Sequence, residues 1–215
     1  MSEGNRTWIG WSFIACALAL PGCQKSSPMN ASPTVSISQA PDGLVIAGAT
    51  TVVFTAVASD ANGDALTMTW DLGDGQTATG ASVVHLYATE GVFPVALTAS
   101  DGRGGVTSVG TSVTAGNLSG RWLLSEGGER FYEWGFDITQ NGSTLGGRPY
   151  SVPDKGCLGD LHGRVISPRT VRFDFTACDG NTVVIDGTAS GDLRRITGTF
   201  THPDGPPQPM VLSRN

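Results

Sequence analysis

Apolar and polar residues alternate with a period of two along most of this chain, which is the pattern of a β-strand with one buried face. The alternation is clear in residues 52–58, 66–72 and 93–99, and it returns several times after residue 118. Gly, Asp and Asn, which favour turns, are concentrated between these segments. The pattern predicts an all-β protein, and the strand spacing in residues 34–115 favours a β-sandwich.

The composition restricts the classes of partner. Hydrophobic residues make up 39% of the 215 residues, which is too many for a wholly disordered chain. Lys and Arg number 13 against 19 Asp and Glu, so the net charge at pH 7 is −6. An acidic surface repels a phosphate backbone, and we therefore expect no nucleic acid among the partners.

The N-terminal segment has the features of an export signal. A weakly basic start precedes an apolar run over residues 8–20, which is too short to cross a bilayer as a helix. The run ends in Leu20-Pro21-Gly22-Cys23, which resembles the lipobox of bacterial lipoproteins. The resemblance implies that residues 1–22 are removed, that Cys23 is acylated and that residues 23–33 form a flexible tether. The alternative is an ordinary cleaved signal followed by an incidental cysteine.

A lipid anchor on Cys23 would hold the protein on a membrane of the bacterial cell envelope without spanning it. Gln24 follows the cysteine and is not the aspartate that is linked to inner-membrane retention in enterobacterial lipoproteins. We therefore expect the outer membrane.

The other cysteines form an even pair. Cys16 lies within the expected signal, which leaves Cys157 and Cys178 in the folded part. Exported proteins commonly contain disulfides, and a bridge here would close a loop of ~20 residues and contribute about 3 kcal/mol. Two free thiols or a metal pair are the alternatives, but the sequence has no CxxC motif and no nearby histidine doublet. We predict the disulfide.

Several motifs in the first unit resemble the PKD family. Residues 70–75 read WDLGDG, close to the family's WDFGDG signature, and an H-x-Y motif and a G-x-F-x-V-x-L run follow at the family's spacing. The resemblance covers residues 34–115 and implies an immunoglobulin-like sandwich. Its signature residues are Trp70, Asp71, Gly73, Asp74, Gly75, His85 and Tyr87.

The signature residues favour a structural role over catalysis. Asp71 and Asp74 lie beside glycines, as expected in a tight turn whose carboxylates accept backbone hydrogen bonds. We expect Trp70 in the core between two sheets and His85 in a local hydrogen bond. Pro94 falls within a central strand and cannot donate a ladder hydrogen bond, so the strand should bulge or face solvent there.

An oxygen-rich loop precedes the signature. It contains Asp60, Asn62 and Asp64, and some PKD-like domains bind calcium in this loop. The run lacks the distal glutamate of an EF-hand, which excludes that kind of site. Two interpretations remain, a calcium site and a loop whose side chains cap its own turn; apart from calcium, we expect no cofactor.

The second unit, residues 118–215, contains about eight short alternating segments, which favours a small antiparallel up-and-down β-barrel. The opening G-x-W and the run F-x-I-x-Q-x-G-x-x-L-x-G over 136–147 resemble avidin-type and lipocalin-type barrels, which implies the same topology. We expect a long loop over 146–161, tied down by the disulfide. The aromatic residues would form a packed core or line a ligand pocket: Trp122, Trp134, Phe136, Phe173 and Phe175.

The motifs of the common enzyme classes are missing from the sequence, including GxSxG, HExxH and the P-loop. PKD-like domains commonly accompany extracellular proteases and glycan hydrolases as spacers or binding modules. We therefore predict a non-catalytic, lipid-anchored binding or adhesion protein whose partner is an envelope or extracellular protein or glycan. The alternatives are a carrier of a small apolar ligand in the barrel and an unrecognised hydrolase.

Overall fold

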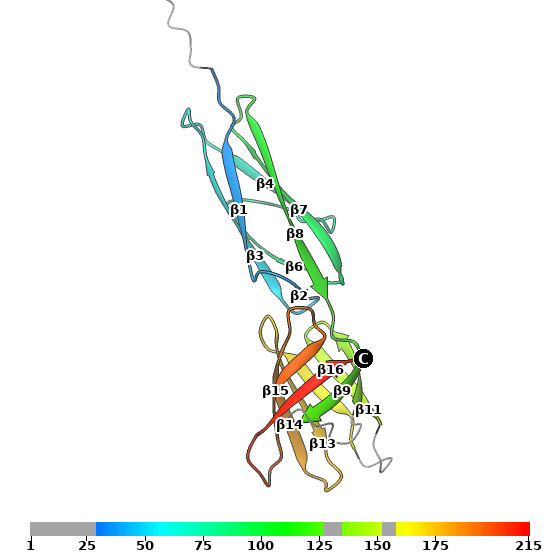
Figure 1. Cartoon of the computed structure of the whole chain (residues 1–215). Helices are drawn as coiled ribbons and strands as arrows, with labels where there is room; N and C mark the ends of the chain where they lie inside the picture. Colours follow the sequence, from blue (N-terminus) through cyan, green and yellow to red (C-terminus); the bar gives the residue numbers. More distant parts are fainter. Residues whose placement is uncertain (1–28, 127–134, 152–157) are drawn as a thin grey trace, which may run out of the picture.

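The computed structural model describes residues 29–126, 135–151 and 158–215. Two β-domains lie end to end and give the molecule an elongated shape (Figure 1). The first described residues lie at the far end of the first domain, and the C-terminus lies beside the junction of the domains (Figure 1). Within the described ranges, no helix has the length and apolar character needed to cross a membrane.

The first domain is a sandwich of two sheets, as predicted. One sheet has the strand order β1-β3-β6 and the other has the order β2-β8-β7-β4-β5. Neighbouring strands are antiparallel except β2 and β8, which are parallel. The strands are β1 (Thr34–Ala40), β2 (Val45–Ile46), β3 (Thr51–Ser59), β4 (Thr67–Asp71), β5 (Thr77–Thr79), β6 (Ser82–Leu86), β7 (Gly91–Ser100) and β8 (Val106–Gly116).

Trp70 lies in the core of the sandwich. Its side chain is fully buried and packs against Phe54, with ring centroids 5.6 Å apart. The indole Nε1 donates a hydrogen bond of 2.9 Å to the Gly80 carbonyl, so the polar atom of the ring is satisfied. Alternate residues of β3 and β7 contribute to this core, namely Val52, Ala56, Val95 and Leu97.

Pro94 is accommodated where β7 has a strand on one side only. β4 pairs with β7 from Ser100 as far as Ala96, whereas β8 pairs with all of β7. Pro94 is exposed, so the strand faces solvent there, which is one of the two expected outcomes. Gly73, with a positive φ of 81°, packs on this proline, and a Cβ at Gly73 would collide with the Pro94 carbonyl oxygen.

The second domain is a closed barrel of eight antiparallel strands, which confirms the expected topology. Each strand pairs with the next along the chain, and β16 returns to pair with β9. The strands are β9 (Gly120–Glu126), β10 (Gly135–Asn141), β11 (Thr144–Ser151), β12 (Leu161–Val165), β13 (Thr170–Thr176), β14 (Thr182–Ala189), β15 (Arg195–Thr201) and β16 (Gln208–Arg214).

Large apolar side chains pack inside the barrel. Trp122, Phe136 and Phe173 are fully buried, and the rings of Phe136 and Phe175 lie 5.2 Å apart. Trp134, the remaining aromatic residue of the predicted set, lies outside the described residues. The described aromatics of this set therefore lie in the core of the barrel.

The predicted loop over 146–161 is wrong at its start. Residues 146–151 belong to β11, which pairs with both β10 and β12. The two prolines and Cys157 of this segment suggested a loop, but Pro149 lies within β11. A Cβ on Gly147 would lie 3.2 Å from the Asp137 carbonyl oxygen, closer than an ordinary contact, so glycine suits the approach of β10 at this position.

The two domains share part of one core. Ile46 of β2 is fully buried among barrel residues, whereas its neighbour Val45 packs in the sandwich core. Gln140 of β10 donates a hydrogen bond of 2.7 Å to the Ala47 carbonyl. Thr50 donates one of 3.0 Å to the Pro168 carbonyl. These contacts join the first domain directly to the barrel.

Candidate functional site

The turn that carries the GDG signature is held by its own aspartates. Asp71 accepts a hydrogen bond of 2.9 Å from the Gly73 amide, and Asp74 accepts one of 3.1 Å from the Gln76 amide. The other oxygen of Asp74 lies 2.7 Å from Nε2 of His85, which is 8% exposed. Both carboxylates and the imidazole therefore stabilise the turn, as the sequence predicts.

Tyr87 is buried beneath the same turn. Its hydroxyl donates a hydrogen bond of 3.0 Å to the Leu72 carbonyl, and its ring stacks on Phe93. Burial, together with the charge of Asp74, raises the pKa of Tyr87 to about 12. Burial raises the pKa of Asp74 too, but the hydrogen bonds from His85 and the backbone outweigh it and lower that pKa. A neutral phenol and an ionised, hydrogen-bonded carboxylate are poor proton-transfer groups near pH 7.

Three carboxylates converge beside the N-terminal segment. Oxygens of Asp60, Asp64 and Asp101 lie within 4.8 Å of one another. Asp101 belongs to the turn between β7 and β8, and its Oδ1 accepts hydrogen bonds of 2.7 Å and 2.9 Å from the amides of Arg103 and Gly105. The hydrogen bond from the Arg103 amide is the largest cause of the lowered pKa of Asp101, so its carboxyl is ionised at neutral pH.

Two oxygens of this cluster are buried without a hydrogen bond in the described part of the chain, Oδ2 of Asp60 and Oδ2 of Asp64. The Asp64 side chain is only 7% exposed, and its other oxygen lies 3.1 Å from Nε of Arg103. A buried carboxylate oxygen without a donor is unfavourable unless a cation compensates it. Calcium binds carboxylates at about 2.3–2.6 Å, so oxygens within 4.8 Å of one another can share one ion. The cluster therefore fits calcium.

The structure changes the expected set of calcium ligands. Oδ1 of Asn62 accepts a hydrogen bond of 2.7 Å from the Ala31 amide, so this oxygen fastens the N-terminal segment. Asp101 joins the cluster instead, and Asn30 donates a hydrogen bond of 2.6 Å to its Oδ2. Residues 30–31, which we expected in the tether, are thereby attached to the domain. Asp101 begins a glycine-rich run, DGRGG, of the kind expected between strands, but only the fold brings this turn to Asp60.

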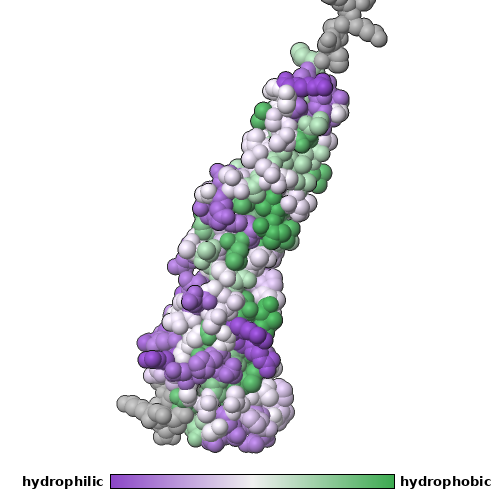
Figure 2. Space-filling model, turned by 180° about the vertical axis from the view of Figure 1, so that it is seen from behind, coloured by the Kyte–Doolittle hydropathy of each residue, from purple (hydrophilic) through white to green (hydrophobic). Residues whose placement is uncertain are grey.

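The outer face of the β1-β3-β6 sheet is a second candidate site. The residues exposed there are all uncharged: Thr34, Ser36, Ser38 and Ala40 of β1, Thr51, Val53, Thr55, Val57 and Ser59 of β3, and Ser82, Val84 and Leu86 of β6. Val57 is 68% exposed and Val84 is 64% exposed. Val53 and Val84 lie opposite each other on neighbouring strands. In Figure 2, apolar surface is concentrated along one side of the first domain.

Comparison with known families agrees with this architecture. The profile described as PKD domain matches residues 30–115. Residues 30–115 form a PKD domain. The match to the PKD family begins at Asn30, the residue whose side chain reaches Asp101, and it ends before the barrel.

The curated relatives are collagenases. The chain is 35% identical over 130 residues to Collagenase ColQ1 of Bacillus cereus (strain Q1), a match that covers 59% of the chain and 13% of the relative. It is 29% identical over 146 residues to Microbial collagenase of Vibrio alginolyticus, covering 68% of the chain and 16% of the relative. The chain thus spans a small part of each enzyme, and the matches do not support catalytic activity in this protein.

Solved PKD domains are among the structural neighbours. The PKD1 domain of Vibrio anguillarum Epp is 22% identical, with 41% of this chain and 98% of that chain covered and a TM-score of 0.35. The PKD1 domain of the Vibrio cholerae metalloprotease PrtV is 26% identical, with coverages of 39% and 96% and a TM-score of 0.34. A carbohydrate-binding module of the β-sandwich superfamily is 14% identical, with coverages of 86% and 91% and a TM-score of 0.40.

The expected lipid anchor and disulfide involve residues outside the described ranges. Cys23 and Cys157 both lie there, whereas Cys178 lies in the turn between β13 and β14. Acylation of Cys23 and pairing of the other two cysteines therefore stay predictions.

Proposed function

We propose that the protein is a non-catalytic binding module of the bacterial envelope, and that it recognises an extracellular protein through the outer face of the β1-β3-β6 sheet. The observation that carries this proposal is the absence of charge from every exposed position of that face. An extracellular glycan is the alternative partner.

The chemistry of the face favours an uncharged partner. Burial of methyl groups is favourable and a partner can replace the hydrogen bonds of the hydroxyls, whereas buried charges need stronger compensation. The acidic residues that give the chain a net charge of −6 lie elsewhere, so they do not repel a partner at this face. Val57 and Val84 protrude by more than half of their area, which gives the partner apolar groups to contact.

Fibrillar collagen is the first probe to test. The relatives that share this segment are named collagenases, and a triple helix is an extended rod with glycine at every third position. Such a rod matches a long, uncharged sheet face better than a compact acidic protein does.

The barrel contributes a rigid support in this proposal. Residues such as Trp122 and Phe136 pack together inside it. The shared core at Ile46 fixes the support to the PKD domain.

A co-sedimentation assay tests the function. The soluble form from Ser26 onward is mixed with fibrillar collagen, with gelatin, and with insoluble cellulose and chitin. We expect retention on collagen with little retention on the glycans. Retention on the glycans alone would show that the partner is a glycan and not a protein. Retention on none of these materials would contradict the proposed binding function for every material tested.

We also propose that Asp60, Asp64 and Asp101 hold a calcium ion that orders the N-terminal segment. The two unpartnered carboxylate oxygens support this proposal. Calorimetric titration with calcium should show one site, and Asp64→Asn should abolish it. Asp42→Asn, in an exposed loop, is the matched control and should bind as the parent does. Absence of binding by the parent would contradict the site.

We further propose that Cys23 carries the lipid that anchors the protein, at the outer membrane. The lipobox-like run before Cys23 and the glutamine after it support this proposal. Labelled fatty acid should enter the protein in cells and should be lost in Cys23→Ala. Label that persists in this variant would contradict the anchor.

A further inference from the structure

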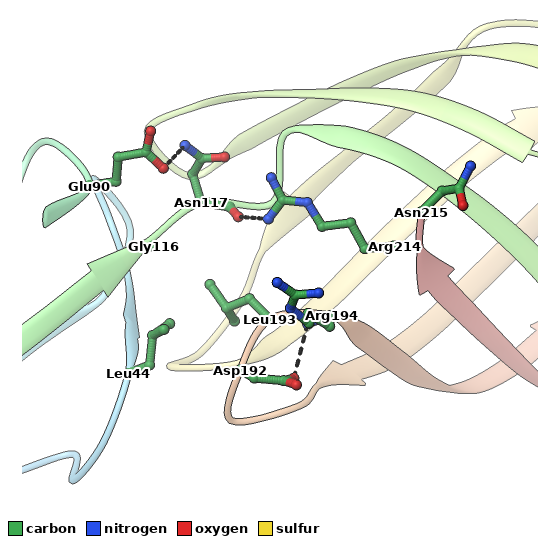
Figure 3. A pocket seen from close by; sticks show the side chains of 9 residues that line it. All are labelled: Leu44, Glu90, Gly116, Asn117, Asp192, Leu193, Arg194, Arg214 and Asn215. Atoms are coloured by element: carbon green, nitrogen blue, oxygen red, sulfur yellow. Dashed lines mark hydrogen bonds between the residues drawn. The ribbon is translucent and has the colours of Figure 1, made fainter.

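A cleft of about 420 Å³ opens at the junction of the two domains (Figure 3). Leu44 of the PKD domain and Gly116 at the end of β8 line one side of it, and Leu193, Arg194 and Arg214 of the barrel line the other. Clefts of roughly 300–1,000 Å³ at domain junctions are common places for small ligands or ligand groups to bind.

The apolar base of the cleft is tightly packed. Leu193 is 2% exposed and adopts a left-handed backbone conformation, with φ at 52°. A Cβ on Gly116 would lie 3.1 Å from Leu193 Cδ1 and 3.3 Å from Leu44 Cδ2, so the two domains meet closely here. The left-handed turn at Leu193 is followed at once by Arg194, which also lines the cleft. Strained, buried positions of this kind are frequent beside ligand sites.

Arg214 is held in place by backbone carbonyls rather than by an acid. Its Nη1 donates a hydrogen bond of 3.2 Å to the Asn117 carbonyl, and its Nη2 donates one of 2.5 Å to the Ser119 carbonyl. Both acceptors belong to the segment that links the domains. The guanidinium is therefore oriented, and its positive charge is not neutralised by these contacts.

Arg194 contributes a second positive charge to the cleft. In the described part of the chain, its guanidinium forms no hydrogen bond and no ion pair, although the charge of Asp192 lies near it. Asp192 instead accepts hydrogen bonds from the Ser190 hydroxyl and from the Arg194 amide. Both Arg194 and Arg214 line the cleft, as Figure 3 shows.

Glu90, the other acidic residue of the cleft, is also bonded to a neutral group. Its Oε2 accepts a hydrogen bond of 2.7 Å from Nδ2 of Asn117. Neither acid of the cleft forms an ion pair with the two arginines among the described residues. Both guanidinium groups can therefore donate charge-assisted hydrogen bonds to a bound anion.

We propose that this cleft binds the carboxylate of a peptide, either an acidic side chain or a free C-terminus. Guanidinium groups match a carboxylate geometrically and can donate two parallel hydrogen bonds to it. The amide of Asn215 offers a further donor, and Leu44 and Leu193 offer apolar contact to the carbon chain that carries the acid. The described lining residues include no aromatic ring on which a sugar could stack, which favours a peptide acid over an acidic sugar. This site is independent of the uncharged sheet face.

An NMR titration of the soluble form with four probes shows which kind of carboxylate the cleft binds. Acetyl-glutamyl-methylamide offers only a side-chain carboxylate, and acetyl-alanyl-alanine offers only a C-terminal carboxylate. Acetyl-glutaminyl-methylamide is the uncharged match, and sodium sulfate is an inorganic anion. We expect one of the two carboxylate probes to shift the backbone amides of Arg194 and Arg214, and the glutaminyl probe to have no effect. Equal affinity for sulfate, or for the glutaminyl probe, would overturn the proposal.

Arg194→Gln is the decisive variant, because this guanidinium makes no hydrogen bond that the fold requires. It should weaken binding of the preferred carboxylate probe at least tenfold while leaving the melting temperature unchanged. Arg195→Gln is the matched control, since Arg195 is the next residue along the chain, is exposed and does not line the cleft. Unchanged affinity in Arg194→Gln, or an equal loss in Arg195→Gln, would overturn the proposal.

Discussion

Gln140 of the barrel donates a hydrogen bond of 2.7 Å to the carbonyl of Ala47 in the PKD domain. The same side chain also donates one of 2.9 Å to the Gly142 carbonyl in its own hairpin. One amide thus joins the hairpin between β10 and β11 to the segment after β2. Beside it, Ile46 inserts into the barrel core, so the two domains are coupled by both polar and apolar contacts.

Ile46→Ala should destabilise the barrel although Ile46 belongs to the PKD domain. Removing a fully buried isoleucine typically costs about 2–5 kcal/mol, and its neighbours here are barrel residues. Hydrogen exchange of the β9 and β10 amides should therefore accelerate. Val45→Ala is the matched control and should accelerate exchange in the sandwich strands instead. Exchange in the barrel that is insensitive to Ile46→Ala would contradict the shared core.

Trp70→Ala should destabilise the PKD domain by about 3–5 kcal/mol, because it removes the ring that packs on Phe54 and leaves a cavity. It also leaves the Gly80 carbonyl without its indole donor. Chemical denaturation measured by circular dichroism gives the change in the free energy of unfolding. A variant that unfolds at the denaturant concentration of the parent would show that this packing contributes little.

The sequence predicted the local features of the fold well. Alternation placed Trp70 and Phe54 on buried faces, and turn-forming residues were expected between strands, as Asn141 and Gly142 are between β10 and β11. These features depend on residues that are close in sequence, so their periods and turn preferences reveal them.

The long-range features could not be predicted in this way. Asp101 joins Asp60 only because two turns meet at one end of the sandwich. Val45 and Ile46 look like one short apolar pair, yet they pack in different cores because successive strand residues face opposite sides. The cleft at Arg194 and Arg214 arises from the docking of the two domains, which no local pattern encodes.

Asp101 should make the attachment of the N-terminal segment sensitive to acid. The Arg103 amide is the largest cause of its lowered pKa, so folding favours the ionised form. The resulting stabilisation is fully present above pH 3.8, the ordinary pKa of an aspartate. It is lost as the pH falls through the lower pKa that Asp101 has in the folded protein. Melting temperatures of the parent and of Asp101→Asn, in EDTA, should differ at pH 6, and the difference should shrink as the pH falls below 3.8. A difference that stays constant over this range would contradict the role of Asp101.

Reduction should lower the melting temperature without removing the β-structure, if Cys157 and Cys178 are bonded. The Gly159 amide donates a hydrogen bond of 2.9 Å to the Thr176 carbonyl, two residues from each cysteine along the chain. This contact supports the predicted pairing. Thiol titration of the unfolded, unreduced protein should find neither of these two thiols. Two reactive thiols in protein isolated from the envelope would refute the bridge.

Binding of the soluble form from Ser26 onward to fibrillar collagen, compared between Val57→Asp and Val92→Asp, tests the proposed function most directly. Both valines are 68% exposed, but Val57 lies on the uncharged face of β3 and Val92 lies in β7 of the other sheet. A charge at residue 57 must be desolvated in the complex, so we expect Val57→Asp to weaken binding at least tenfold, or about 1.4 kcal/mol. Val92→Asp should bind as the parent does. Equal affinity of the parent and Val57→Asp for collagen would contradict the account.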